Sequence, residues 1–281
     1  MYLFSKTKLV LVSLVLFFLT CSFGVSAQNS SSNLEIPENA PPTSRTNLRA
    51  TTESWNGLYL KFRLTDRFFY YQENHYRRRS SIDNRTDFVG RMSQLYNRAG
   101  LTYLVNPNFE ITLGPTLVWN FTPTPGDLNF EKTTLEPRIW HQWLLNHSMG
   151  RVKILHQFRF EHRWKRDNRV GEDYQYTDRW RYKFFAYIPI NKPRMEDKTF
   201  FISPSNEFFF EAGKHTLDIF EENRIYTAIG YTYGNFQFFG GHMWTYGPSN
   251  FATYRNRHII RLNVFYNLDF RKDILKPKLT D

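Results

Sequence analysis

Large apolar and polar residues alternate along most of the chain with a period of two. Residues 151–165 show the pattern well, with apolar side chains at one parity and mostly charged side chains at the other. Residues 256–270 repeat it near the end of the chain. Because neighbouring side chains in a strand point to opposite faces, whereas a helical face repeats about every 3.6 residues, this alternation predicts β-strands.

About ten segments carry this alternation. They cover residues 54–71, 86–104, 108–121, 133–145, 151–165, 175–190, 200–211, 222–233, 236–246 and 256–270. Most are longer than the ~5–6 residues of an average soluble strand and reach the ~9–11 residues that a membrane-spanning strand needs. Short and long connections alternate between them, which is typical of outer-membrane barrels. We therefore predict an all-β, antiparallel up-and-down β-barrel of about ten strands, whose even number would place both termini on the periplasmic side.

Arginine and glutamate dominate the parity that would face the barrel interior. The expected interior charges are Arg63, Glu136, Arg138, Arg159, Glu161, Arg163, Arg179, Arg181, Glu207, Glu211, Glu222, Arg224 and Arg261. Such side chains on neighbouring strands can form ion pairs where water is scarce. We therefore predict a charge ladder that fills a narrow lumen. A soluble β-sandwich, whose polar face would meet bulk water, is the alternative architecture.

The opposite parity is rich in Phe, Tyr, Trp and Leu. Several large aromatic residues lie near segment ends, among them Trp119, Trp164 and Trp244, where an outer-membrane barrel carries its aromatic girdles. The last segment ends in Asn267-Leu268-Asp269-Phe270, which resembles the terminal signal of outer-membrane proteins. Many such proteins end at the aromatic residue, whereas residues 271–281 follow it here.

The two ends of the chain differ from this central region. Lys6 and Lys8, the apolar stretch 9–19 and the small residues 25–27 predict a signal peptide over residues 1–27, cleaved near Ala27. Residues 28–53, rich in Ser, Asn, Pro and Thr, predict a flexible periplasmic leader. The barrel domain should then span 54–270, followed by a polar tail, 271–281. We expect the protein in the cell outer membrane, with the periplasm as the alternative.

The charge of the chain and the placement of its basic residues limit the kinds of partner to expect. The formal net charge is +11 and the sequence pI is about 9.6, which raises the question of nucleic acid. The basic residues alternate with aromatic ones instead of clustering on a helix, and an exported chain meets lipid phosphates first. We therefore expect no nucleic-acid partner. The expected partners are outer-membrane lipid, lipopolysaccharide and, during insertion, the barrel-assembly machinery, and the oligomeric state stays open.

A set of loose motifs in fixed order resembles a known family. The motifs are Glu161-His162-Arg163-Trp164, Asp178-Arg179-Trp180-Arg181-Tyr182, Asn206-Glu207-Phe208-Phe209, Phe220-Glu221-Glu222-Asn223-Arg224-Ile225-Tyr226 and Ala228-Ile229-Gly230-Tyr231. Together with the last strand they resemble domain-of-unknown-function family 2490, over most of residues 54–270. The resemblance implies an exported bacterial β-barrel-like protein with no established activity and no catalytic residues to transfer.

The sequence offers little recognisable catalytic chemistry. Its one cysteine, Cys21, lies in the predicted signal peptide, and Thr20 before it is a poor match to a lipidation signal. The histidines form no HExxH or His-x-His pattern, no GxSxG elbow is present, and Gly240-Gly241 lies inside a strand pattern. We expect no metal, no cofactor and no catalytic residues. An enzyme would need any two of His75, His215 and His242 to converge at one rim with a carboxylate within hydrogen-bond reach.

Arg77, Arg78 and Arg79 form the densest local run of positive charge. Because they fall in the predicted loop 72–85, we expect them outside the cell, in contact with lipid phosphates that arginine binds bidentately. A solvated charged loop is the alternative.

Three functions remain in competition. The first is a structural or envelope-associated barrel with a filled lumen. The second is a narrow channel or transporter for small solutes, selective for anions because basic residues are in excess inside. The third is a barrel enzyme that acts on envelope lipid or peptide.

Overall fold

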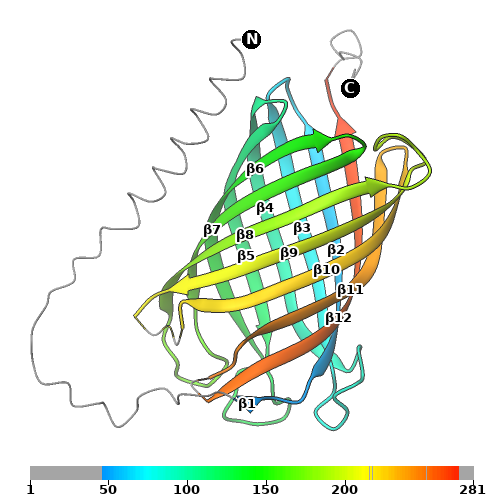
Figure 1. Cartoon of the computed structure of the whole chain (residues 1–281). Coiled ribbons are helices and arrows are strands. Elements are labelled where there is room, and N and C mark those ends of the chain that lie inside the picture. The colour runs from blue at the N-terminus through cyan, green and yellow to red at the C-terminus, as the bar shows by residue number, and fades with distance from the viewer. Residues whose placement is uncertain (1–45, 215, 217, 251, 272–281) are drawn as a thin grey trace, which may run out of the picture. The chain divides into compact units, whose positions relative to one another are not determined.

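The structure, a computed structural model, describes residues 46–214, 216, 218–250 and 252–271. Strands β2 to β12 close into one barrel (Figure 1), in which each pairs antiparallel with its neighbour in sequence. The barrel closes where β12 pairs in parallel with β2, and the short β1 pairs in parallel with the start of β12. The described residues include no helix long and apolar enough to cross a membrane. The predicted signal peptide, most of the leader and most of the tail lie outside the described residues.

The strands are β1 (Thr46–Asn47), β2 (Thr51–Arg63), β3 (Phe68–Arg79), β4 (Arg91–Asn106), β5 (Phe109–Phe121), β6 (Thr133–Met149), β7 (Val152–Lys165), β8 (Gln175–Pro189), β9 (Phe200–Ala212), β10 (Phe220–Tyr233), β11 (Phe236–Pro248) and β12 (Thr253–Asp269). The all-β up-and-down barrel is thus confirmed, and the β-sandwich is excluded for this region.

The count of ten was one strand short because the predicted segment 54–71 contains two strands. The four-residue connection 64–67 divides them, and Thr65 Oγ1 accepts a hydrogen bond from the Phe68 amide at 3.0 Å. Most of the predicted loop 72–85 is therefore strand β3. This strand was missed because its outward face carries Gln72 and Asn74 where the pattern requires apolar residues. The other nine predicted segments match β4 to β12 with ends within five residues.

Because the barrel has an odd number of strands, its first and last strands, β2 and β12, run in the same direction. The chain thus enters the barrel at one end and leaves it at the other. The even strand count behind the prediction that both termini share a side therefore does not hold, and the termini themselves lie outside the described residues. Connections 64–67, 107–108, 150–151, 190–199 and 234–235 lie at one end, here called the turn end, and the connections that follow β3, β5, β7, β9 and β11 lie at the other, here called the loop end.

One predicted hairpin holds in detail. Gly234 and Asn235 join β10 to β11 in a two-residue turn, and Gly234 has φ = 54°. A positive φ of this kind is favourable for glycine and strained for most other residues, which fits the turn types that join antiparallel strands.

The barrel is polar inside and apolar outside. Among the described residues, 31 buried residues are polar or charged and only 14 are apolar. Some of the buried apolar residues form a cluster on one side of the interior. The cluster includes Trp55, Phe201, Phe239, Met243 and Ile259. This distribution is the reverse of that in a soluble protein, where most buried residues are apolar.

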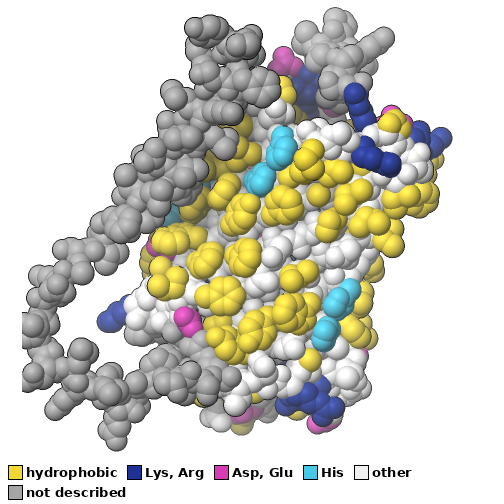
Figure 2. Space-filling model, viewed as in Figure 1, with side chains coloured by type: hydrophobic (Ala, Val, Ile, Leu, Met, Phe, Trp, Pro, Cys, Tyr) yellow, Lys and Arg dark blue, Asp and Glu magenta, His cyan; other side chains and the backbone are white. Residues whose placement is uncertain are grey.

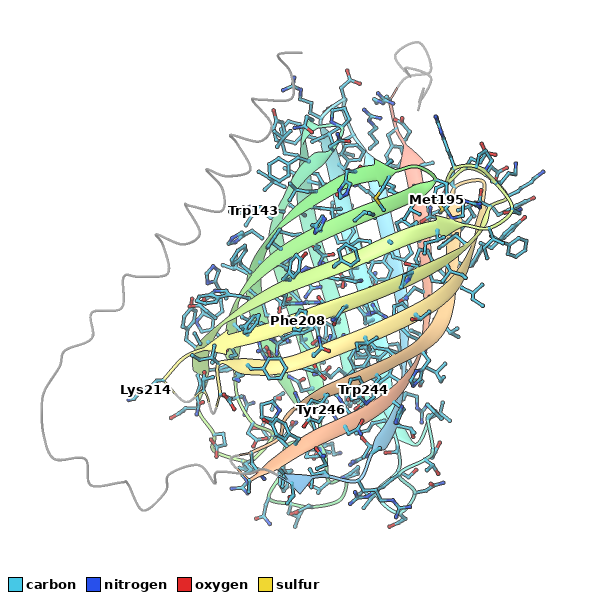
Figure 3. All side chains as sticks on the ribbon, viewed as in Figure 1. Trp143, Met195, Phe208, Lys214, Trp244 and Tyr246 are labelled. Atoms are coloured by element: carbon cyan, nitrogen blue, oxygen red, sulfur yellow. The ribbon has the colours of Figure 1, made fainter. Side chains whose placement is uncertain are left out.

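The outer face carries many exposed large apolar residues. Leu113, Ile229 and Leu262 are each more than half exposed although they lie within strands. Figure 2 shows such side chains spread over the tilted strands of the visible face, between basic residues toward the two ends. Trp244 and Tyr246 stack at 5.7 Å near the loop end (Figure 3). Three amides, Gln72, Asn74 and Asn97, interrupt the apolar face and hydrogen-bond to one another.

Candidate functional site in the barrel interior

Glu161 on β7 is the centre of the interior ion-pair network. Its carboxylate oxygens lie 2.6 Å from Arg98, 3.1 Å from Arg138, 3.5 Å from Arg179 and 3.0 Å from Arg181. The Glu161 side chain is fully buried. One carboxylate thus connects β7 with its neighbours β6 and β8, whose inward positions lie beside it in the register. It also connects β7 with β4, which is not adjacent to it in the sheet.

A second carboxylate, Glu73 on β3, extends the network across the barrel. It lies 2.8 Å from Arg98, 3.4 Å from Arg159 and 2.7 Å from His75 Nε2. The hydroxyl of Tyr71 donates to it at 3.2 Å. Arg98 therefore bridges Glu73 and Glu161, which links β3, β4 and β7 through side chains alone.

Further ion pairs lie toward the loop end. Glu136 lies 2.7 Å from Arg163 and 2.9 Å from Arg138, and Glu211 lies 3.2 Å from Arg163 and 2.5 Å from Lys165. Glu222 pairs with Arg224 at 2.7 Å and also contacts Arg257. Charged groups removed from water are costly unless they are paired, so these contacts allow the strands to keep their charges inside.

Stacked arginines and aromatic rings cross the middle of the lumen. We call this set the central layer, and it consists of Tyr96, Arg77, Trp55, Arg224, Phe209 and Arg181. Arg77 lies 3.7 Å from the Trp55 ring and 4.3 Å from that of Tyr96. Arg224 lies 5.0 Å from Trp55 and 4.0 Å from Phe209, and Arg181 lies 4.6 Å from Phe209. Glu161 and Arg138 then complete a ring back to Tyr96, whose hydroxyl accepts a hydrogen bond from Arg138 at 3.2 Å.

Two hollows flank the central layer. The turn-side cavity has a volume of about 220 Å³, and the loop-side vestibule has about 620 Å³. Both are lined by Trp55, Arg77, Tyr96 and Arg224, so the central layer lies between them. The interior is therefore divided rather than being a uniform pore.

Two long connections fold against each other beside the vestibule. Arg166 donates two hydrogen bonds to the Glu131 carboxylate, at 2.5 and 2.7 Å, and they lower the pKa of that carboxyl below its usual range. The Asn168 side chain donates to the backbone oxygens of Asn120 and Glu131 at 3.2 and 3.4 Å. These contacts join 122–132 to 166–174 at the loop end.

The structure brings together twelve of the thirteen interior charges expected from sequence. Eleven of these take part in ion pairs with one another or with neighbours, and Arg261 donates to the Tyr59 hydroxyl at 2.7 Å. Arg63 differs because it lies at the turn end and donates to the backbone oxygens of Thr65 and Asp66. Glu73 and Arg98, among others, were not among the predicted interior charges. Glu73 fell in the predicted loop, whereas the strand parity of Arg98 could have placed it inside.

The predicted basic loop at Arg77 to Arg79 is wrong in its position, because all three residues belong to β3. Arg77 is buried in the central layer. Arg79 faces inward and donates to Ser93 Oγ at 2.8 Å, whereas Arg78 contacts Tyr76 and the backbone oxygen of Gly90. Of the three, only Arg78 has the outward parity that a contact with lipid phosphates requires.

Among the described residues, His75 and His242 do not converge at one rim of the barrel. His75 lies inside, 2.7 Å from Glu73 and 3.3 Å from the Tyr59 hydroxyl, whereas His242 lies on the outer face, 3.1 Å from His258. His215 lies outside the described residues. Among the described residues, no group of three or more His, Cys, Asp or Glu side chains could hold a metal ion.

Comparison with known proteins gives one match. A family model described as a protein of unknown function, DUF2490, matches residues 52–256. This range contains most of the barrel, from the second residue of β2 to the beginning of β12. Curated proteins and solved structures yield no match.

Proposed function

The chain belongs to the DUF2490 family of proteins of unknown function, and from this premise we propose that it is an outer-membrane β-barrel whose lumen is filled by its own side chains. Its role would be structural or envelope-associated. The observation that carries the proposal is the inverted distribution of side chains, apolar on the outer face and charged inside.

The outer face supports a lipid environment. Monomeric soluble proteins rarely expose apolar patches larger than a few hundred Å², whereas exposed apolar residues here occur on most strands of the barrel. Strands β2 to β12 have 12 to 17 residues, which exceeds the ~9–11 residues needed to cross a bilayer. Their apolar parts would lie in the hydrocarbon and their ends at the interfaces.

The interior supports a filled lumen. Barrels of about 8 strands are just filled by side chains, and those of 16–18 leave an aqueous channel. Eleven strands are nearer the smaller size, and this chain fills the space with long arginine and aromatic side chains. The central layer would therefore block free passage.

The partners proposed for such a barrel follow from its surface. Outer-membrane lipid would cover the apolar face, and lipopolysaccharide phosphates would be within reach of outward basic groups such as Arg78. The barrel-assembly machinery would act during insertion, since the unpaired strand edges of an incomplete barrel are costly in hydrocarbon.

Leu262→Arg tests the environment of the outer face. Leu262 lies at mid-strand on β12 and is 54% exposed. In a bilayer, an arginine there should lower the free energy of unfolding by about 2–4 kcal/mol, because lipid-facing charges near the midplane carry that cost. The measurement is denaturant unfolding of the native chain and the variant in lipid vesicles.

Leu128→Arg is the matched control, since Leu128 is 94% exposed in the connection 122–132. It should leave the unfolding free energy nearly unchanged. Equal tolerance of both substitutions, or recovery of the native chain as a freely soluble periplasmic protein, would contradict a membrane location.

A narrow anion channel is the second candidate, favoured by the excess of basic residues around the turn-side cavity. It predicts that reversing the charge at Arg159, Arg181 or Arg261 reduces the preference for anions over cations. The reversal potential of single channels in a salt gradient measures this. Protein that stays silent in planar bilayers, or reversals that leave selectivity unchanged, would remove this candidate.

A further inference from the structure

The turn-side cavity has many more positive than negative groups in its wall. Its basic residues are Lys61, Arg77, Arg98, Arg138, Arg159, Arg179, Arg181, Lys183, Arg224 and Arg261, and its carboxylates are Glu73, Glu110 and Glu207. The nearby Glu161 compensates part of this excess through its four arginines. A surplus of positive charge still remains where water is scarce, and buried charges are costly unless they are paired.

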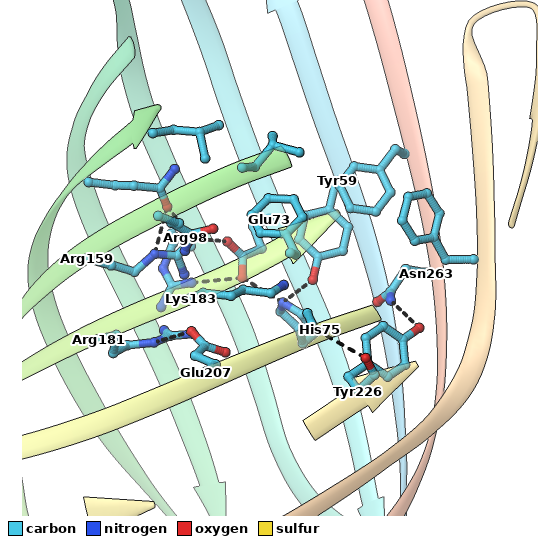
Figure 4. Close-up of a pocket in the computed structure, with 18 of the residues that line it drawn as sticks. Tyr59, Glu73, His75, Arg98, Arg159, Arg181, Lys183, Glu207, Tyr226 and Asn263 are labelled. Carbon is cyan, nitrogen blue, oxygen red and sulfur yellow. Dashed lines mark hydrogen bonds and ion pairs between the residues drawn. The ribbon is translucent and has the colours of Figure 1, made fainter. Parts of the chain in front are cut away.

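Lys183 and Arg261 account for part of this excess of positive charge. In the part of the chain that the structure describes, no carboxylate lies within ion-pair distance of either group. The Lys183 amine lies over the Phe185 ring at 4.6 Å. Its largest charge interaction is attraction to Glu207, which repulsion from Arg261, Arg181 and Arg159 opposes. Figure 4 shows Lys183 reaching between the Arg159–Glu73 pair and His75.

Several buried atoms in the cavity wall lack a hydrogen-bond partner, and two of them lie close together on β12. These two are Arg261 Nε, a donor, and Asn263 Oδ1, an acceptor. Buried polar groups without partners are unfavourable, and a bound water or ion is one way to satisfy them. The hydroxyls of Tyr59 and Tyr226 lie next to them, since Arg261 donates to Tyr59 and the Asn263 amide donates to Tyr226 at 3.4 Å.

The volume limits what can occupy this space. The cavity has a volume of about 220 Å³, which leaves room for several water molecules. Sites for drug-sized ligands occupy ~300–1,000 Å³. The cavity therefore suits a small ion with several acceptor oxygens, which can take hydrogen bonds from an ammonium, a guanidinium and a phenol at once.

We propose that the turn-side cavity binds a small oxyanion, with Lys183 and Arg261 as its principal cationic ligands. The anion balances charge that the side chains leave unbalanced. Asn263 Oδ1 would accept a hydrogen bond from the hydroxyl of a protonated oxyanion such as hydrogen phosphate. This site goes beyond the proposed filled lumen, since a barrel can be blocked without binding any ligand.

Calorimetric titration of the full chain in detergent with inorganic phosphate tests the site. Sodium chloride of equal ionic strength is the parallel titration. The native chain should show saturable phosphate binding that chloride does not reproduce. Lys183→Met should weaken it by about tenfold or more, because hydrogen bonds to a charged group contribute about 1.5–3 kcal/mol.

Lys153→Met is the matched control. Lys153 belongs to β7, next to β8, and shares the inward parity, but it does not line the cavity. This variant should bind phosphate as the native chain does. If Lys183→Met does not fold, Arg261→Gln takes its place, and a folded variant of either kind must show the loss.

Two results would overturn the site. One is a native chain whose response to phosphate equals its response to chloride. The other is an equal loss of binding in the cavity variant and in Lys153→Met, which would indicate a general effect of charge. Both results test the anion site and not the membrane location. The membrane location is tested separately, by comparing Leu262→Arg with Leu128→Arg.

Discussion

Glu161→Gln is expected to lower the free energy of unfolding by about 3–5 kcal/mol, the range for breaking a buried ion pair by removing one partner. The substitution keeps the size of the side chain and removes its charge. It leaves Arg98, Arg138, Arg179 and Arg181 without their common carboxylate. Because the interior already has an excess of positive charge, no nearby group can replace it.

Denaturant unfolding of the purified barrel in detergent or lipid measures this effect. Glu131→Gln is the matched control, since Glu131 also pairs with an arginine, Arg166, but in the exposed connections at the loop end. It should change the unfolding free energy very little. Equal stabilities of the two variants would show that the network around Glu161 does not hold the strands together.

A double variant tests whether the penalty comes from uncompensated charge. Arg181→Met removes one of the four guanidinium groups and also separates Glu207 from its partner. In the Glu161→Gln background, Arg181→Met should lower the free energy of unfolding by less than it does in the native chain, because it also relieves repulsion among the remaining arginines. If the two losses of unfolding free energy simply add, the penalty does not come from uncompensated charge, since residues within one network are expected to couple.

The sequence predicted the strands whose two faces differ clearly. In β7, inward charges such as Arg159 and Glu161 alternate with outward aromatic residues such as Phe158 and Phe160, so one period identified both the strand and its interior face. The charge ladder followed from the same parity. When the inner and outer faces of a barrel meet different environments, the alternation of polar and apolar residues in the sequence therefore predicts its strands.

Strand β3 shows where that pattern fails. Its outward positions include Gln72 and Asn74, and its inward positions include Glu73 and Arg77, so both faces are polar. The resulting loop prediction removed a strand from the count, made the number even and placed Arg77 outside. One misread strand thus changed the strand count and the assignment of a central residue.

The central layer could not be predicted because it depends on geometry across the lumen. Trp55 and Phe209 come from strands far apart in sequence, and each was expected only as an aromatic residue of one parity. Closure of β12 onto β2 brings β10 near β2, and Arg224 then stacks between the two rings. Parity assigns a side chain to the interior, but the partner it meets there depends on barrel closure and strand tilt.

The largest functional change is expected from a combined Trp55→Ala and Arg77→Ala variant, which should convert a silent barrel into an ion-conducting one. Trp55 lies between Arg77 and Arg224 in the central layer, and it lines both hollows. Removing the two large side chains would join the turn-side cavity to the loop-side vestibule. The remaining arginines should make the opened path prefer anions, since a basic lining attracts them.

Single-channel recording in planar bilayers measures this change, with the native chain as the reference. Trp180→Ala is the control, because Trp180 is an outward tryptophan that is 50% exposed on β8, and its loss should leave the barrel silent. Truncating a large buried aromatic residue costs about 3–5 kcal/mol, so each variant must first be shown to be folded by its heat-dependent shift in gel mobility. A folded double variant that stays as silent as the native chain would mean that the barrel is closed elsewhere, whereas steady conductance in the native chain would mean that the central layer does not close it at all.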